Sequence, residues 1–298
     1  MLWIPITIGA AVTQLARNAL QSGLRGTVGT LGATMVRFLY AIPFALLAYG
    51  VAVWGLGEPV PGFPTAMVGW TLVGALAQIG ATALMLVAMH MRGFAIAYAY
   101  IKTEPVMLAV GGWWLLGDVL PLGAWAGIVI ATLGVMWASL PRGGGLAAMR
   151  GEAAPMFCGL LSGALFGISS LAFRAAILTL KGAAPWMAAL HVMTIALLVQ
   201  TALMLGWLWF TDRSVISATF REWRPSLGAG FTGMVATLLW FTGFALTATA
   251  NVRTLGLVEM PLAALLNRRV SGRHLGAREW TGIALVALGI GLLLRAVV

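Results

Sequence analysis

The stretch LPLGAWAGIVIATLGVMWASL, from Leu120 to Leu140, decides the fold class of this chain. It contains no charged residue, and its length matches the roughly 20 apolar residues that an α-helix needs to cross a bilayer. The whole chain has the same character, because 61% of its 298 residues are hydrophobic and only 9% are charged. Ordinary soluble domains are about one-quarter charged. The composition therefore excludes a soluble globular protein and indicates a surface that faces lipid.

Further apolar runs of similar length recur along the chain between short polar segments. The ten expected spans cover roughly residues 4–24, 30–54, 64–91, 94–116, 120–140, 153–179, 184–210, 226–247, 250–266 and 277–294. Strands of a membrane barrel would be about half as long and would alternate in polarity, which these runs do not. The sequence thus predicts an all-α polytopic membrane protein with ten transmembrane helices.

The longest interruption of the apolar pattern lies at mid-chain and predicts a linker, residues 142–152, between two halves, residues 1–141 and 153–298. Sliding the second half back by 155 positions aligns Glu104 with Glu259, Gly117 with Gly272, Trp125 with Trp280, Gly127 with Gly282 and Gly134 with Gly289. Five spans per half would place the two copies in opposite orientations across the membrane. We therefore expect two inverted five-helix repeats.

These aligned segments resemble the drug/metabolite transporter superfamily, and within it the ten-helix carriers made of two EamA-type halves. The resemblance rests on Thr103-Glu104-Pro105, Leu116-Gly117-Asp118, Trp125-Ala126-Gly127 and Leu133-Gly134-Val135, echoed by Glu259-Met260-Pro261, Gly282 and Leu288-Gly289-Ile290. More narrowly, the chain looks like the aromatic amino acid and methyl viologen exporter branch. The resemblance implies a carrier that moves amino acids, nucleotide-type metabolites or drugs, often outward. Asp118 stands where the family usually has an acidic residue, whereas its repeat partner is Arg273.

Polar side chains inside the apolar spans are candidates for a substrate path, because ionisable groups at membrane depth are costly. In the first span, Gln14, Arg17, Asn18 and Gln21 are spaced i, i+3, i+4 and i+7 and so share one helix face. This face would line a wet path in which Arg17 holds a carboxylate, or it would supply hydrogen bonds between helices. We favour the wet path, because the other spans offer few polar partners.

Other candidate substrate-binding side chains lie in three later spans. Amphipathic aromatic rings beside a cation suit a flat organic substrate, although such rings also occupy packed or interfacial positions. The candidates are Gln78 in the third span, Tyr98, Tyr100 and Lys102 in the fourth, and Trp240 and Phe244 in the eighth.

Matched helix breaks are predicted at Pro105 and Pro261, directly after Glu104 and near Glu259. Interrupted helices at corresponding positions of two repeats point to a carrier's central site. Either glutamate, or His191, is a candidate proton carrier. The alternatives are ion pairs of the glutamates with Arg17, Arg37, Lys102 or Arg174, and a hydrogen bond within the bundle for His191. Four basic and two acidic residues in the spans leave positive charge over, which favours an anionic group such as a carboxylate on the substrate.

The sequence has no pattern typical of an enzyme. Magnesium-dependent lipid enzymes need acidic clusters, but the chain has two isolated aspartates, Asp118 and Asp212. Its three histidines and single cysteine form no metal or nucleophile motif, and Arg142-Gly143-Gly144-Gly145 lacks the ending of a phosphate-binding loop. We expect no catalytic activity, no metal and no cofactor. The basic residues are scattered singly, so we expect no nucleic acid partner either.

The loops carry an asymmetric charge that predicts orientation. Eleven arginines fall in loops on one side, whereas Lys181, Arg253 and Arg295 fall on the other, so both termini are predicted outside the cytoplasm of a bacterial inner membrane. We expect a monomeric carrier that exports aromatic and other neutral amino acids by alternating access through a central cavity. The alternatives are an exporter of cationic drugs or nucleotide-type metabolites, and a channel or structural membrane protein without saturable flux.

Overall fold

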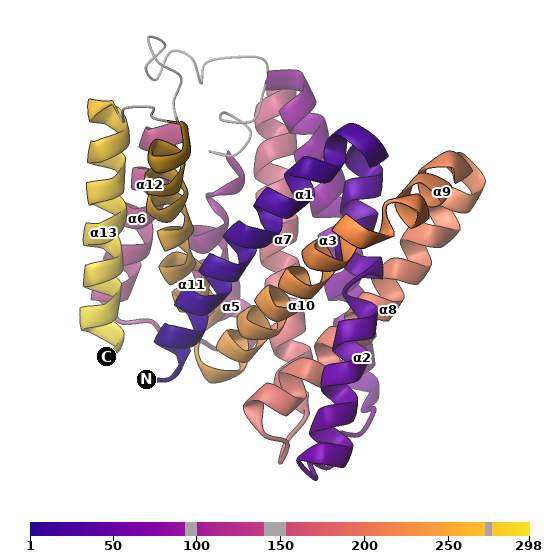
Figure 1. The fold of residues 1–298 in the computed structure, drawn as a ribbon. Coiled ribbons are helices and arrows are strands. Elements are labelled where there is room, and N and C mark those ends of the chain that lie inside the picture. Colours follow the sequence, from indigo (N-terminus) through magenta and orange to yellow (C-terminus); the bar gives the residue numbers. More distant parts are fainter. Residues whose placement is uncertain (93–99, 140–152, 272–275) are drawn as a thin grey trace. The chain divides into compact units, whose positions relative to one another are not determined.

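The computed structural model describes residues 1–92, 100–139, 153–271 and 276–298. Within these ranges every regular element is a helix and no strand occurs, and seven helices are long and apolar enough to cross a membrane (Figure 1). They are Gly26–Gly55, Thr65–Ala88, Leu122–Ser139, Ala154–Thr179, Pro185–Thr211, Trp223–Leu246 and Ala277–Val297. The prediction of an all-α, multi-pass membrane protein is confirmed.

The helices form two compact units, and each unit combines segments from both halves of the sequence. Unit 1 comprises Met1, Leu76–Ala172 and Thr247–Val298, and unit 2 comprises Leu2–Ala75 and Phe173–Leu246. Two long helices, α3 (Thr65–Arg92) and α7 (Ala153–Thr179), contribute residues to both units. The units divide the chain by contact, whereas the two predicted repeats divide it by sequence similarity.

In unit 2, the long helix α1 (Trp3–Leu39) packs along α10 (Trp223–Leu246). The other elements of this unit are α2 (Ile42–Gly50), the π-helical turn η1 (Val51–Gly55), α8 (Pro185–Thr211) and α9 (Arg213–Arg221). Gly29 has a φ of 69°, which favours glycine, and it interrupts α1 between the first and second expected spans. A Cβ at Gly230 would lie 2.3 Å from the carbonyl oxygen of Tyr40, so only glycine permits this approach.

The short helix α9 was not predicted from the sequence. Asp212 caps its N-terminus by accepting a hydrogen bond from the backbone N–H of Ser214 at 3.1 Å. The hydrogen bonds that the Asp212 carboxylate accepts from Ser214, first from its side chain, hold the pKa of Asp212 below its usual range. This carboxylate is therefore charged at neutral pH and stabilises the start of α9.

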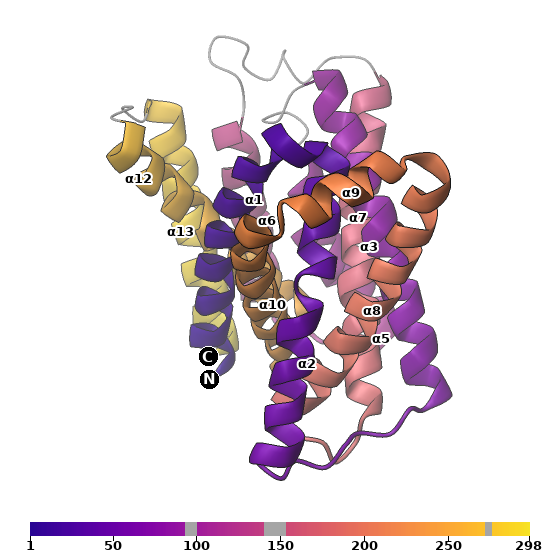
Figure 2. The same ribbon diagram turned by 45° about the vertical axis from the view of Figure 1, so that its right-hand side comes forward.

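In unit 1, α6 (Leu122–Ser139) and α13 (Ala277–Val297) form a tight antiparallel contact. The other elements of this unit are α5 (Glu104–Leu116), α11 (Thr249–Leu255), the 3-10 turn η3 (Gly256–Val258) and α12 (Glu259–Ser271). A Cβ at Gly127 would lie 2.5 Å from the carbonyl oxygen of Gly289, and one at Gly134 would lie 2.9 Å from that of Gly282. The two helices lie side by side in both ribbon views because glycines line their contact (Figure 2).

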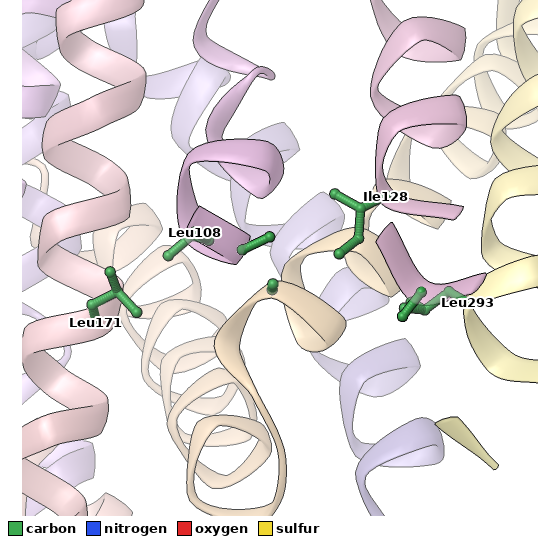
Figure 3. Close-up of a cluster of buried hydrophobic side chains, with 7 residues drawn as sticks. Leu108, Ile128, Leu171 and Leu293 are labelled. Carbon is green, nitrogen blue, oxygen red and sulfur yellow. The ribbon is translucent and has the colours of Figure 1, made fainter. Parts of the chain in front are cut away.

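A buried apolar cluster joins α5 and α7 to these two helices. Figure 3 shows Leu108 of α5, Ile128 of α6, Leu171 of α7 and Leu293 of α13, all buried. Lipid tails are as apolar as these side chains, so close packing rather than exclusion of water holds the cluster together. The cluster fixes α5 close to the polar residues of unit 1.

Candidate functional site

Two helices of unit 1 begin at glutamates. α5 begins at Glu104, with Pro105 next in its first turn, and α12 begins at Glu259, two residues before Pro261. Proline suits the first turn of a helix, where its missing N–H leaves no hydrogen bond unmade, and a carboxylate there is stabilised by the helix dipole. The residues before each glutamate are not α-helical, since Lys102 lies in a turn and η3 precedes α12. These glutamates are the two that the offset of 155 positions aligns.

Each glutamate forms an ion pair with a cation from the other half of the sequence. Lys102 Nζ donates a hydrogen bond to Glu259 Oε1. Arg253 Nε lies 3.2 Å from Glu104 Oε1. The two carboxylates and two cations of this four-charge network therefore balance one another.

Ser170 of α7 joins one of these pairs. Its hydroxyl donates to Glu104 Oε1 at 3.4 Å and accepts a hydrogen bond from Arg253 Nη2 at 3.2 Å. Ser170 is fully buried, as is usual for a hydroxyl with two hydrogen-bond partners. Glu104, Arg253 and Ser170 thus form a closed triangle, whereas the contact of Lys102 with Glu259 is direct.

The cations of the network are more accessible than the carboxylates. The side chains of Lys102 and Arg253 are 16% and 19% exposed, whereas those of Glu259 and Glu104 are 10% and 9% exposed. The side chains of the two cations are thus somewhat more exposed than those of their partner carboxylates.

Glycines on α7 bring this helix against the residues that precede α5. A Cβ at Gly163 would lie 2.9 Å from the carbonyl oxygen of Ile101, and one at Gly159 would lie 2.7 Å from Cβ of Tyr100. Ser170 follows Gly163 by seven residues, about two helical turns, and so lies on the same face of α7. The small residues of α7 thereby position its hydroxyl beside Glu104.

A second polar cluster lies in unit 2, between α1 and α10. Trp240 Nε1 donates to Gln14 Oε1 at 2.9 Å, which joins two predicted site residues. Arg17 Nη2 donates to Asn18 Oδ1 at 2.9 Å, and a Cβ at Gly233 of α10 would lie 3.3 Å from Arg17 Cδ. Arg17 is buried and Asn18 is exposed, so the polar face of α1 runs from the helix contact to the surface.

Phe244 and His191 also lie in unit 2, each within a packed environment. Phe244 is fully buried against Phe241, with ring centroids 6.0 Å apart, and its carbonyl oxygen accepts a hydrogen bond from Arg174 Nε at 3.1 Å. His191 Nδ1 shares a hydrogen bond of 2.7 Å with the hydroxyl of Tyr49. The imidazole thus has the hydrogen bond within the bundle that was one interpretation of the sequence.

The predicted site residues are distributed between the units. Unit 1 holds Gln78, partly buried on α3, and the buried Tyr100 together with Lys102, Glu104 and Glu259. Unit 2 holds Gln14, Arg17, Asn18, His191, Trp240 and Phe244. Tyr98 lies outside the described residues.

Arg253 is the member of the network that the sequence reasoning missed. The loop count assigned it to one membrane surface, at the edge of the expected span 250–266, but it lies in α11 and pairs with Glu104. The sequence did hold a signal that Arg253 belongs to the site. It lies about one and a half helical turns before Glu259, and a cation so close to a helix break seldom faces lipid.

No group of three or more metal-binding side chains gathers in the described ranges.

Residues 154–295 match the EamA-like transporter family. A crystal structure of a protein has the same fold at a TM-score of 0.76 and 18% sequence identity, over 99% of this chain and 97% of that one. No curated protein matches the sequence. The predicted resemblance is thus confirmed for an EamA-like domain, while the exporter branch remains a prediction.

Proposed function

We propose that this chain, whose residues 154–295 form an EamA-like transporter domain of the drug/metabolite transporter superfamily, is a secondary active carrier that exports amino acids. One observation carries the proposal. Glu104 and Glu259, at the starts of two interrupted helices, are each paired with a cation from the other sequence half. Charged residues at membrane depth are rare because they are costly, and at broken helices they often mark a substrate or ion path. Members of this family are transporters, which agrees with the expected lack of catalytic activity.

The proposed architecture is ten helices in two inverted repeats, residues 1–141 and 153–298. Beyond the seven apolar helices, three segments would span as well, and each is polar or interrupted: residues 3–28, 100–116 and 249–271. Contacts between α6 and α13 support the repeat. Gly127 and Gly134 are the repeat partners of Gly282 and Gly289, and each glycine of α6 contacts the partner of the other one. Such reciprocal contacts are expected when a two-fold axis relates two copies.

The charge distribution favours a substrate with a carboxylate. The side chains of Lys102 and Arg253 are more exposed than those of the glutamates that they pair with, so an anionic group can compete for these two cations. Arg17 and the indole of Trp240 offer a second cation and a flat ring in unit 2, which suits aromatic and other neutral amino acids. The resemblance to the aromatic amino acid exporter branch points the same way.

We further propose that the carrier acts as a monomer in a bacterial inner membrane, with both termini outside the cytoplasm. The charge bias of the sequence, with eleven arginines on one side against three basic residues on the other, supports this orientation. Glu104, Glu259 and His191 are the candidate proton carriers. A reporter that is active only in the cytoplasm should be silent when it is fused to the C-terminus.

The direct test is uptake of a panel of labelled amino acids into proteoliposomes, with and without a pH gradient. Saturable uptake that unlabelled aromatic or neutral amino acids suppress is the expected result. Flux that rises linearly with concentration would indicate a channel. Saturable uptake of drugs or nucleotides, with none for any amino acid, would replace the proposed substrate.

A further inference from the structure

We propose that the surface around α9 binds an anionic phospholipid, with arginine side chains on the headgroup phosphate and aromatic rings against the apolar chains. The site is formed by residues at and between the ends of α8 and α10, none of which takes part in the proposed transport. We call it the α9 surface, and its members are Arg213, Arg221 and Arg224 with Trp209, Phe210, Phe220 and Trp223.

The helix α9 lies where a membrane surface is expected. It joins α8, whose apolar span ends at Thr211, to α10, whose span begins at Trp223. With nine residues, α9 is about 14 Å long, less than half of the roughly 30 Å that a spanning helix must cross. Figure 2 shows α9 running crosswise to α8. An amphipathic helix in such a position lies in the interface, with its polar face toward the headgroups.

The two sides of α9 differ in burial. Thr219 is buried, and its carbonyl oxygen accepts a hydrogen bond from the hydroxyl of Tyr40 at 3.0 Å, so this side packs against the end of α1. Phe220, the next residue, is 53% exposed, and the other three aromatic members of the α9 surface are 48% to 86% exposed. Rings that stay so exposed suit the boundary between headgroups and acyl chains, where tryptophan is enriched. The α9 surface thus offers an apolar contact to lipid chains.

Indole rings position two of the guanidinium groups. Arg213 Cζ lies 4.3 Å from the centre of the Trp209 ring, and Arg213 Nε donates to the carbonyl oxygen of Trp209 at 2.8 Å. Arg224 Cζ lies 5.3 Å from the centre of the Trp223 ring. A stacked guanidinium group still presents the donors at its edge, in a fork that matches two phosphate oxygens. Within the described ranges the three arginines of the α9 surface form no ion pair, so a phosphate can bind them without displacing a carboxylate.

The charge of this stretch favours an anionic lipid over a zwitterionic one. Three arginines and two carboxylates, those of Asp212 and Glu222, lie between residues 209 and 224, which leaves one positive charge in surplus. The carboxylate of Asp212 is engaged in capping α9. Arg213, Ser217 and Arg221 follow at intervals of four residues and share one helix face. That face therefore has a cation at each end.

A local fluorescence titration tests the lipid and its charge. Ser217→Cys in a Cys158→Ala background places one environment-sensitive dye on the cationic face of the detergent-solubilised protein. Dioctanoyl-phosphatidylglycerol should change the emission saturably. Dioctanoyl-phosphatidylcholine should need at least about fivefold more lipid, the factor expected for one positive charge near an anionic lipid surface. Equal responses to the two lipids would overturn the proposal. So would the same saturable change with sodium phosphate alone, because the site would then bind free anions rather than lipid.

Charge variants assign the binding to the α9 surface. Arg213→Gln, Arg221→Gln and Arg224→Gln should each weaken binding of the anionic lipid about fivefold. Glu222→Gln should strengthen it by about the same factor, because it adds to the surplus of positive charge. Lys181→Gln is the matched control, since it removes an exposed cation near the other end of α8, and it should leave the affinity unchanged.

Native mass spectrometry of the same variants without the dye measures lipid binding independently. Exposed side chains are exchanged throughout except at the half-buried Glu222, so the variants should fold as the unmodified protein does. Unchanged affinity for phosphatidylglycerol in all four charge variants refutes the proposal. No substrate enters these experiments, so their outcome is independent of the proposed function.

Discussion

Replacing Arg253 with methionine should destabilise the protein strongly, and neutralising Glu104 in the same molecule should reverse most of the effect. Arg253→Met leaves the carboxylate of Glu104, whose side chain is 9% exposed, without its cation. Breaking one partner out of a buried ion pair costs about 3–5 kcal/mol. The double variant with Glu104→Gln keeps neither charge of this pair. Its loss of folding stability should therefore be that of about one hydrogen bond, near 1 kcal/mol. The double variant should therefore be more stable than Arg253→Met by about 2–4 kcal/mol.

Thermal unfolding in detergent measures this difference in stability between the single and the double variant. Cys158 of α7 is the chain's single cysteine and is partly buried, so a thiol-reactive dye reports its exposure. For units of this size, each kcal/mol of lost folding stability lowers Tm by about 2–4 °C, so Arg253→Met should lower Tm by roughly 6–20 °C. Arg278→Met is the matched control, because Arg278 lies over the exposed ring of Trp137, and it should cost less than about 1 kcal/mol. A double variant that unfolds as early as Arg253→Met would refute the pairing.

Three further predictions concern the packing and capping of the helices. Gly289→Ala should cost about 1–3 kcal/mol in thermal unfolding, because its Cβ would lie 2.4 Å from the backbone nitrogen of Ala131; Gly291→Ala, with open space around it, should cost little. Gln14→Leu leaves the indole N–H of the buried Trp240 without this acceptor, so it should cost about 1–3 kcal/mol, and combining it with Trp240→Phe should cost less than the sum of the two single losses. The pKa of Asp212 is lowered in the folded protein, chiefly by the hydrogen bond from the Ser214 side chain. The contribution of this carboxylate to the stability of α9 is therefore present at neutral pH and is lost as the pH falls through the folded pKa. The protection of the α9 amides from exchange, taken relative to the intrinsic exchange rate at each pH, should accordingly fall in acid, whereas Asp212→Asn, which caps without titrating, should remove that pH dependence.

Features that depend on local sequence could be predicted well. Uncharged runs such as Leu120–Leu140 became helices because a bilayer offers no partner for an open backbone, and α6 runs from Leu122 to Ser139. The starts of α5 and α12 lie where Glu104 and Glu259 stand beside prolines, which fix the backbone locally. A helix break is a property of a few neighbouring residues, so it can be read from the sequence.

Features that depend on contacts between distant segments could not be predicted in the same way. The pairing of Lys102 with Glu259 was one of several ion pairs left open, because charge alone does not say which helix faces which. Arg253 was counted among the cations of one membrane surface, because nothing in the adjoining sequence shows that it pairs with Glu104. Arg17 and Lys102, both expected to bind substrate, lie in different units, and their sharing of one site stays a prediction.

The glycine contact of α6 with α13 has a consequence for biosynthesis. Gly127 and Gly134 enter the membrane early, but Gly282 and Gly289 are made about 150 residues later. Chains grow at about 5–20 residues per second, so this face of α6 stays uncovered for roughly ten seconds or more. A small-residue face of this kind binds other helices readily. The nascent α6 therefore needs a temporary neighbour, either the insertion machinery or another helix of the same ribosome-bound chain, until α13 arrives and displaces it.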